Sequence, residues 1–288
     1  MGKAFKERYP GHALITGASG GIGEAFARKL AKLGVNLVLV ARRKSRLDEI
    51  AAELTQAYGI QVHTIGLDLL ARDAHSKIKS ELDTKKIQIG MLVNNVGFGT
   101  FGRFHELSVE KELEMIDLNC RLPVALTAMV LPEMIQRKNG ALIFLGSVGS
   151  YQPTPFFTTY GATKAFDLMF GEGLWAELKP HGVDVIVLTP GFTRTEFQNT
   201  AGNREQKAVM GWQTADQVVD ICLNKLGKTL SVVPGIGNFL LIWFIRFTPR
   251  FLAAKLAYKI SDLNHRKCKR LDGSFSDIDK GKWPQRPN

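Results

Sequence analysis

The sequence predicts an α/β fold in which helices cover both faces of a doubly wound parallel sheet. Two observations along the 288 residues predict it. Short, continuously apolar runs, which are typical of buried strands, alternate with longer segments of helical periodicity. No hairpin turn joins one apolar run to the next, so the strands must be connected by crossovers and lie parallel. A chain of this length is expected to form a single large domain with a sizeable core.

The first strand, turn and helix organise the rest of the chain. An apolar run ends at Thr16, a glycine cluster follows (Gly17, Gly21 and Gly23), and an amphipathic segment starts at Glu24. The first N–H groups of a helix lack partners and the helix dipole favours negative charge there, so this turn suits a phosphate. Because the next apolar run follows at the spacing of a βαβ unit, the segment indicates a Rossmann-like dinucleotide site. A βα turn without a ligand is the alternative for this motif alone.

The other elements follow in the same alternation. Strands are expected at residues 35–40, 62–67, 89–93, 141–145, 183–188 and 231–233, and helices at 45–58, 72–82, 108–137, 157–178 and 214–226. Pro123 should disturb the long helical region near its middle because proline lacks an N–H. Polar or turn-forming residues end four strands, namely Asp68, Asn94, Ser147 and Pro190-Gly191. Ligands bind such sheets at the carboxyl ends of the strands, so these residues mark the expected site.

Composition and charge exclude several classes of protein. The 45% hydrophobic and 23% charged residues are those of an ordinary globular protein. The three cysteines and six histidines show neither a disulfide framework nor metal-ligand spacing, so no metal is predicted. The polar N-terminus does not resemble a signal peptide, and we expect a cytoplasmic protein. From Lys225 onward thirteen Lys/Arg face four Asp/Glu, which places +9 of the net charge of +11 in the last 64 residues. The nearly neutral remainder argues against a nucleic-acid-binding core.

One rival motif overlaps the glycine cluster. Gly17-Ala-Ser19-Gly-Gly21 also fits the G-x-S-x-G turn that carries the nucleophile of serine hydrolases. That chemistry needs an acid and then a histidine at later loop positions. After His105 only His181 and His265 remain, and neither follows a strand end. Phosphate binding therefore explains the turn better than hydrolysis.

Taken together and in this order, the motifs resemble those of the short-chain dehydrogenase/reductase family, and in particular its hydroxysteroid dehydrogenase and 3-ketoacyl reductase branch. The matching segments span residues 12 to about 233: Thr16–Gly23 (TGxxxGxG), Asn94–Gly97 (NNAG with Val96 for Ala), Asn119, Ser147, Tyr160–Lys164 (YxxxK), and Pro190–Gly191 with Thr193 and Thr195. The resemblance implies that Asn119, Ser147, Tyr160 and Lys164 are catalytic. It also implies that Gly17, Ser19, Gly21, Ile22, Gly23, Arg42, Arg43, Asp68, Asn94, Gly97, Tyr160, Lys164, Pro190, Gly191, Thr193 and Thr195 bind the cofactor. Val96 is the one small departure, and we expect it to crowd the adenosine side slightly.

The chemistry of these residues agrees with that resemblance. Tyr160 and Lys164 lie four apart and share one helix face, which on its own is more often an exposed surface pair. Combined with Ser147 at a strand end, they form a proton-transfer site: the lysine ammonium favours phenolate and eases proton exchange, while the serine hydrogen-bonds a substrate oxygen. The resemblance places Asn119 in an interrupted helix that holds a water for a proton relay.

The end of the second strand indicates the cofactor. It carries Arg42 and Arg43, and no acidic residue occurs from Gly34 through Leu47. A carboxylate there would bind the ribose hydroxyls of NAD, whereas planar guanidinium donors suit a 2′-phosphate. We therefore expect NADP(H), with solvated surface charge as the alternative. Asp68 has two compatible roles, as a helix N-cap or, by resemblance, at the adenine amino group.

Aromatic residues in the loops after the later strands predict an apolar substrate cleft. They are Phe98, Phe101, Phe104, Tyr151, Phe156, Phe157, Phe192, Phe197, Met210 (the one non-aromatic member) and Trp212. A hydride would pass between nicotinamide and a carbonyl or secondary alcohol of a lipid-, steroid- or ketoacyl-like substrate. The alternative is a catalytically silent family member that senses dinucleotide or binds lipid. Family members often form dimers or tetramers through the helices of Asn119 and Tyr160, so a homodimer or homotetramer is expected.

The last segment, residues 234–288, lies beyond the family motifs of the catalytic domain, 1–233. The apolar run Asn238–Ile245 is too short to span a membrane, and 251–260 carries Lys255 and Lys259 four apart. A basic cluster follows at 265–270. Three uses stay open for this amphipathic, basic extension: a lid over the cleft, a subunit contact, or peripheral membrane contact through 234–270, which we prefer.

Overall fold

The protein is built on a seven-stranded parallel sheet, as the sequence predicts. The computed structural model describes residues 2–195, 197 and 211–271. The strands lie in the order β3-β2-β1-β4-β5-β6-β9, and each strand pairs with its neighbours in parallel. Their bounds are β1 (His12–Thr16), β2 (Asn36–Ala41), β3 (Val62–Gly66), β4 (Ile89–Asn94), β5 (Gly140–Leu145), β6 (Val183–Leu188) and β9 (Ser231–Val232). The order reverses between β1 and β4, which is where doubly wound sheets bind their ligands.

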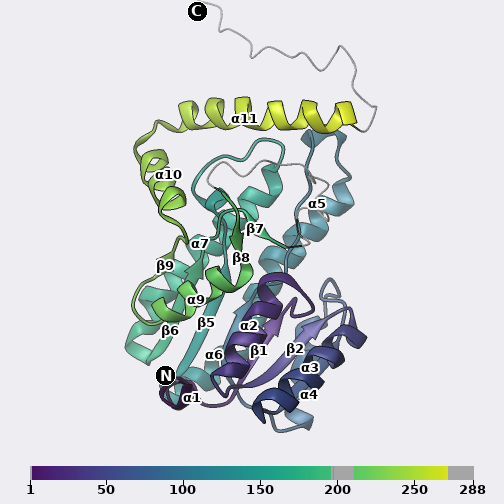
Figure 1. Cartoon of the computed structure of the whole chain (residues 1–288), viewed down its shortest axis with the longest axis vertical. Helices are drawn as coiled ribbons and strands as arrows, with labels where there is room; N and C mark the ends of the chain where they lie inside the picture. The colour runs from purple at the N-terminus through teal and green to yellow at the C-terminus, as the bar shows by residue number, and fades with distance from the viewer. Residues whose placement is uncertain (1, 196, 198–210, 272–288) are drawn as a thin grey trace, which may run out of the picture.

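Helices cover both faces of the sheet (Figure 1). One face packs on α2 (Gly21–Lys32), α3 (Lys44–Tyr58) and α9 (Ala215–Lys225), and its buried cluster includes Phe26, Ile50 and Val218. The other face packs on α4 (Ala74–Thr84), α6 (Leu122–Arg137) and α7 (Thr158–Leu178), with Ile78, Leu126 and Leu168 buried there. The central strands β4 and β5 are buried at every position, which explains their unbroken apolar sequence.

The long helical region predicted at 108–137 is interrupted one turn before Pro123. Helix α5 (Val109–Ile116) continues into a π-helical turn, Asp117–Arg121, and then into α6. Pro123 has no N–H for the carbonyl of Asn119 four residues earlier, so the regular ladder must break there. Residues 109–137 are long and apolar enough to cross a membrane, but Leu122, Leu126 and Met134 are buried against the sheet. This is a core helix.

Several boundaries differ from the sequence expectation. Helix α4 begins at Ala74 behind Asp73, so Asp68 is not its N-cap; the Asp68 carboxylate instead accepts a hydrogen bond from the Leu70 N–H at 3.1 Å, in the loop that follows β3. A short helix, α1 (Gly2–Arg8), precedes β1, and two-residue strands β7 (Thr193–Arg194) and β8 (Gln213–Thr214) pair near the site. These short elements depend on tertiary contacts and carry too little periodicity to be predicted.

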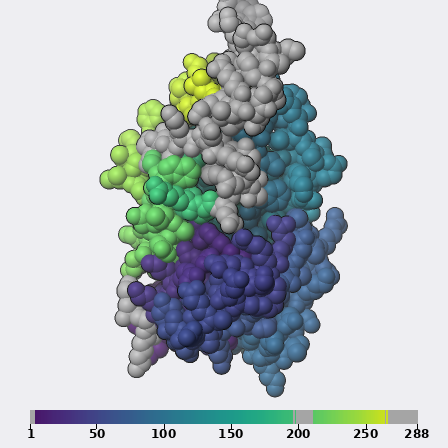
Figure 2. Space-filling model, turned by 45° about the vertical axis from the view of Figure 1, so that its right-hand side comes forward, coloured from purple at the N-terminus to yellow at the C-terminus, as the bar shows by residue number. Residues whose placement is uncertain are grey.

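The segment after β9 forms two helices beside the carboxyl edge of the sheet. They are α10 (Ile236–Phe247) and α11 (Arg250–Leu271), and α11 runs across the end of the molecule opposite the N-terminus (Figure 1). In Figure 2 the yellow-green surface of these helices lies at the end far from the purple N-terminal half. The inward residues of α11 include Ala253, Asp262 and His265, which are buried.

Candidate active site

The ends of β1 and β4 are tied together by side-chain hydrogen bonds. The Thr16 hydroxyl donates to the Val93 carbonyl at 3.2 Å and accepts from the N–H groups of Asn95 and Val96, both at 3.1 Å. The Asn95 amide donates to the carbonyls of Thr16 and Gly17 at 2.8 and 3.3 Å. These bonds fix the backbone at the point where the strand order reverses.

The glycine turn fits tightly against this network. Gly17 and Gly21 have φ values of +67° and +58°, which favour glycine. A Cβ on Gly23 would lie 2.4 Å from the Gly17 carbonyl oxygen and 2.5 Å from the Asn95 amide nitrogen. A Cβ on Gly21 would contact Thr195 at 3.2 Å, so the loop after β6 reaches the same turn. The glycines therefore leave backbone without side chains at the N-terminus of α2, and we call this turn the cradle. Ser19 and Ile22 belong to the same turn.

The arginines predicted to choose the cofactor follow β2 beside that cradle. The Arg43 guanidinium donates to the Ser19 carbonyl at 2.9 Å and to its hydroxyl at 3.3 Å. Arg42 is exposed at the strand end, and so is Asp68 at the end of the neighbouring strand. All three lie on the side of the turn away from β4, where the adenosine half of a dinucleotide would be expected.

Asn119 lies in the π-helical turn and is 1% exposed. Its side chain exchanges two hydrogen bonds with the backbone of Phe98, at 3.0 and 3.2 Å, and donates to the Thr163 hydroxyl at 3.0 Å. A Cβ on Gly97 would lie 2.9 Å from the Asn119 oxygen and 3.6 Å from the Lys164 nitrogen. Asn119 thus joins the loop after β4 to α7 directly beside Lys164.

Ser147 lies close enough to Tyr160 for its side chain to oppose the rise in the pKa of the phenol. Ser147 begins a 3-10 turn after β5, and its hydroxyl accepts from the Gly149 N–H at 3.1 Å. The Ser150 hydroxyl accepts from the Ser147 N–H at 3.0 Å and donates to the Lys164 carbonyl at 2.7 Å. The turn after β5 is therefore anchored on α7, and it presents the serine hydroxyl to the phenol.

Lys164 lies next to Tyr160 but is paired with another group. Its ammonium donates to the Leu145 carbonyl at 2.6 Å and to the Asp167 carboxylate at 2.9 Å, and it lies 5.9 Å from the Tyr160 ring centroid. Burial raises the pKa of Tyr160, and Lys164 and Ser147 oppose that effect without overcoming it. The expected influence of the lysine is present, but burial outweighs it and the phenol keeps its proton at neutral pH.

The loop after β6 closes the other side of the site. The Val148 N–H donates to the Pro190 carbonyl at 3.0 Å, and the Thr193 hydroxyl donates to the Gly191 carbonyl at 3.2 Å. A Cβ on Gly191 would lie 2.5 Å from the Asn238 amide, so α10 packs directly on this loop. Thr195 continues the loop back to the glycine turn.

Aromatic side chains wall the space beside Tyr160. Its ring lies 5.2 Å from that of Phe197 and 6.0 Å from that of Phe157, and Phe101 lies 4.8 Å from Phe157. His265 of α11 stacks on Phe156 at 4.7 Å. Phe192 pairs with Trp212 at 5.6 Å, whereas Phe104 is 62% exposed and does not join the wall. Met210 lies outside the described residues.

Most predicted residues therefore meet along one edge, and Asn94 is the exception. Asn94 is buried, and its amide points behind the sheet to Thr127 at 3.5 Å. Its neighbour Asn95, which was not among the predicted site residues, makes the contacts to the glycine turn. The doubled asparagine was a signal that either residue could face the turn, because successive residues of a strand point to opposite sides.

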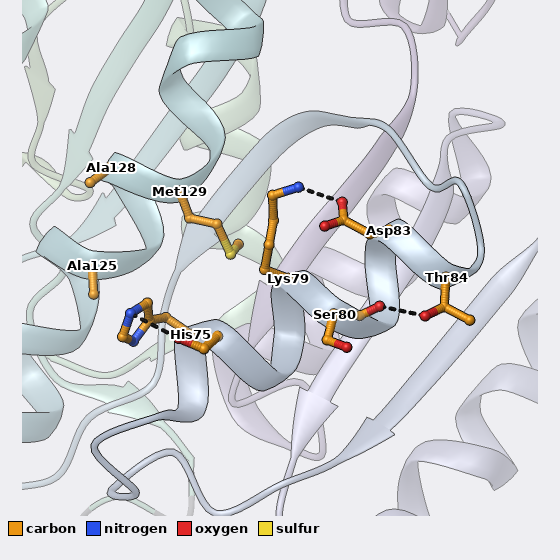
Figure 3. A pocket seen from close by; sticks show the side chains of 9 residues that line it. His75, Lys79, Ser80, Asp83, Thr84, Ala125, Ala128 and Met129 are labelled. Atoms are coloured by element: carbon orange, nitrogen blue, oxygen red, sulfur yellow. Dashed lines mark hydrogen bonds and ion pairs between the residues drawn. The ribbon is translucent and has the colours of Figure 1, made fainter.

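The hollow in Figure 3 lies elsewhere. It is formed by His75, Ser76, Lys79, Ser80, Asp83, Thr84, Ala125, Ala128 and Met129, on α4 and α6. Its sticks show an ion pair between Lys79 and Asp83 rather than convergent reactive groups (Figure 3). Its lining comes from these two helices, whereas Ser147, Tyr160 and Lys164 meet at the carboxyl edge of the sheet.

The chain is similar to several known proteins. The pattern of the short chain dehydrogenase family matches residues 11–206. A very-long-chain 3-oxoacyl-CoA reductase of Pyrenophora tritici-repentis is 34% identical over 255 residues, covering 84% of this chain and 72% of that protein. A 7beta-hydroxysteroid dehydrogenase of Mediterraneibacter gnavus is 34% identical over 237 residues, covering 81% and 89%. A short-chain dehydrogenase of Sphingobium yanoikuyae, solved with NADPH, superposes with a TM-score of 0.73 at 36% identity, covering 78% and 88%.

The chain belongs to the short-chain dehydrogenase family. It is an oxidoreductase that transfers a hydride between a nicotinamide and a carbonyl or secondary alcohol carbon. The predicted fold and family are thereby confirmed.

Proposed function

We propose that this protein is an NADP(H)-dependent reductase of apolar ketones, with Asn119, Ser147, Tyr160 and Lys164 as its catalytic residues. The observation that carries the proposal is the convergence of Ser147, Tyr160 and the buried Lys164 at an aromatic-walled strand edge. A silent binding module would have no need of all these groups. The test is a panel of ketones assayed for loss of NADPH absorbance, on which steroid and long-chain 3-keto substrates are expected to turn over.

The cradle fits a dinucleotide. Gly17, Gly21 and Gly23 leave no side chain at the α2 N-terminus, and Gly97 brings the backbone after β4 close to Asn119 and Lys164. Pro190, Gly191, Thr193 and Thr195 line the opposite side. When bound there, the nicotinamide supplies or accepts the hydride. Of the residues singled out for cofactor binding, Asn94 is the one whose placement favours a supporting role over contact.

The chain's own residues move and stabilise the proton. Ser147 and Tyr160 would both hydrogen-bond the ketone oxygen, and Tyr160 would release its proton to that oxygen as negative charge grows there. The Lys164 ammonium stabilises the resulting phenolate, which offsets only part of the effect by which burial raises the pKa of Tyr160. Asn119 holds the loop at Phe98 and the helix at Thr163 in place around these groups.

The preference for NADP(H) rests on the end of β2. Arg42 and Arg43 are exposed there, Arg43 bonds the glycine turn at Ser19, and the neighbouring sequence offers no acid up to Leu47. A guanidinium beside this turn can meet a 2′-phosphate with charge-assisted hydrogen bonds. The NADPH complex of the Sphingobium yanoikuyae relative supports the same choice.

We also propose that residues 1–233 form the catalytic domain and that 234–288 combine two uses that the sequence left as alternatives. The inward face of α11 serves as a lid, since Tyr258 and His265 contact Phe156 at 5.7 and 4.7 Å. The outward face, formed by exposed side chains of both α10 and α11, is a peripheral membrane contact. It exposes Phe239, Leu240, Trp243, Phe244, Phe247, Phe251, Leu252, Leu256, Ile260 and Leu263 together with Arg246, Arg250, Lys255 and Lys259.

So many exposed apolar side chains, with basic side chains beside them, suit binding to an anionic lipid surface. Helix α10 has 12 residues, which is short of a span, so it would lie in the interface. A lipid-like ketone would then approach the aromatic wall from the same surface. This proposal gives the protein a cytoplasmic location with association to a membrane.

A second apolar surface favours self-association. Helices α5, α6 and α7 expose Val109, Leu113, Ile116, Val124, Phe166 and Met169. The π-helical turn of Asn119 joins α5 to α6, and Tyr160 lies in α7, so this is the region through which family members pack. We propose a homodimer or homotetramer built on this surface.

A further inference from the structure

Asp167 is a buried carboxylate that the proposed chemistry has not used. It lies on α7 three residues after Lys164, and its side chain is almost completely enclosed: Asp167 is 3% exposed and Lys164 is 5% exposed. The two charges meet at 2.9 Å. Burying an ion pair usually gains little stability over apolar residues of similar size. A role in the site explains the pair better than folding stability does.

The Lys164 ammonium has three hydrogens to place. One goes to the Leu145 carbonyl at 2.6 Å and one to Asp167 at 2.9 Å. These two acceptors fix the nitrogen between β5 and the interior of α7, beside the backbone of Gly97 and 5.9 Å from the Tyr160 ring centroid. Within the described part of the chain these are its two hydrogen-bond acceptors, so the third hydrogen is left for a ligand or water on that side.

We propose that Asp167 is the positioning residue of this site: it keeps Lys164 charged and aimed past Tyr160 toward the bound cofactor. The inference rests on the proposed function of Tyr160 and Lys164. Asp167 acts through the lysine and does not itself touch the reacting atoms.

The charges around the pair support this assignment. The titratable groups facing Asp167 are Lys164 and Tyr160 of α7 and Cys120 of the π-helical turn. Burial alone would lower the pKa of Lys164, but Asp167 and Tyr160 together outweigh it and the pKa is raised. Without the carboxylate, burial would be the largest remaining effect and the lysine would lose its proton at lower pH.

The test compares Asp167→Asn with the wild-type protein. Asparagine keeps the shape and an acceptor for Lys164 while removing the charge. Asp167→Glu keeps the charge, and Asp83→Asn neutralises an exposed carboxylate that pairs with Lys79 in the same way. Two readouts are taken for each variant: the pH profile of kcat/KM for ketone reduction, and the titration of the Lys164 side chain by NMR in the cofactor-free protein, assigned with Lys164→Arg.

In wild type we expect Lys164 to titrate above the ordinary lysine value of about 10.4. In Asp167→Asn we expect its titration and the alkaline limb of the profile to fall by at least about one pH unit. Asp167→Glu and Asp83→Asn should both keep the wild-type pH profile of kcat/KM.

Equal titration of Lys164 in wild type and Asp167→Asn would overturn the proposal. So would a wild-type lysine that titrates below its ordinary value, a result that needs no variant to fold. If wild type turns over no ketone with NADPH, the proposed function fails, and the NMR titration still decides the role of Asp167.

Discussion

The side-chain amide of Asn95 donates to the carbonyl oxygen of Thr16 at 2.8 Å, across the gap between the ends of β4 and β1. The same amide nitrogen lies 2.5 Å from the point where a Cβ on Gly23 would be. The first turn of α2 therefore packs directly on the bond that closes the switch in strand order. The cofactor cradle and the core of the sheet are one rigid unit at this point.

Gly23→Ala should damage that unit. The added methyl would overlap the Gly17 carbonyl and the Asn95 amide, at a cost of about 1–3 kcal/mol in the free energy of unfolding. NADPH binding should weaken with it, because the α2 N-terminus must move away from the turn. Thermal unfolding and fluorescence titration with NADPH measure the two effects.

Gly173→Ala is the matched control for that substitution. Gly173 lies in α7 with no atom within 4 Å of the position of an added Cβ. There the same change should stabilise the protein by about 0.5–1 kcal/mol, because alanine loses less entropy in a helix. Equal effects of the two substitutions would show that the tight fit at Gly23 has no consequence.

Tyr160→Phe should reduce turnover by about 10²–10⁴-fold, the range of general acid catalysis, because only the proton donor is lost. NADPH affinity should stay near wild type, since the ring and its contacts to Phe157 and Phe197 remain. Lys164→Ala should impair both turnover and binding. Steady-state kinetics and NADPH titration separate these effects, and a Tyr160→Phe variant with near wild-type kcat would remove the tyrosine from the mechanism.

The fold and most of the site could be predicted because they depend on local pattern. Unbroken apolar runs gave β4 and β5, and the glycine spacing at residues 17–23 gave the cradle, since both are set by backbone requirements that a few residues satisfy. The interruption near Asn119 was predicted from Pro123, although the π-helical turn precedes the proline. The position shifts because the missing N–H affects the carbonyl four residues earlier.

Other features depend on contacts that one sequence does not display. Whether Asn94 or Asn95 contacts the glycine turn depends on which face of β4 meets that turn. The net rise in the pKa of Tyr160 depends on burial and on the nearby Asp167, neither of which follows from the spacing of Tyr160 and Lys164. Which face of α11 is buried and which is exposed depends on aromatic contacts such as that of His265 with Phe156.

NADPH should bind at least about tenfold more tightly than NADH, a difference of about 1.4 kcal/mol. Arg42→Ala should remove most of that difference by deleting a charge-assisted contact with the 2′-phosphate. Lys228→Ala, which neutralises an exposed charge in the turn before β9, should not change it. Isothermal titration with both dinucleotides checks the prediction, and equal wild-type affinities would exclude NADP(H) preference whatever the variant does.

The oligomer should depend on the apolar surface of α5–α7. Met169 is 62% exposed on α7, and Met169→Glu would place a charge in a contact between copies at a cost of several kcal/mol. Size-exclusion chromatography with light scattering should then report smaller particles than for wild type. Phe239→Glu on α10 is the control and should leave the mass unchanged. A monomeric wild type at micromolar concentration would contradict the proposed assembly.

Membrane association should depend on the outward face of α10 and α11. Trp243 and Phe247 contact each other at 5.0 Å and are 57% and 70% exposed, and each nearby Lys or Arg adds about 1 kcal/mol near anionic headgroups. The full chain should float with anionic liposomes at low salt and be released as salt rises. Trp243→Glu with Phe247→Glu should abolish flotation while ketone reduction in detergent-free buffer persists. Val109→Glu, which adds a charge at an equally exposed apolar position on α5, should float like wild type. If wild type stays in the soluble fraction at low salt, the outward face has another occupant, and the lid contacts of His265 and Tyr258 remain the function of α11.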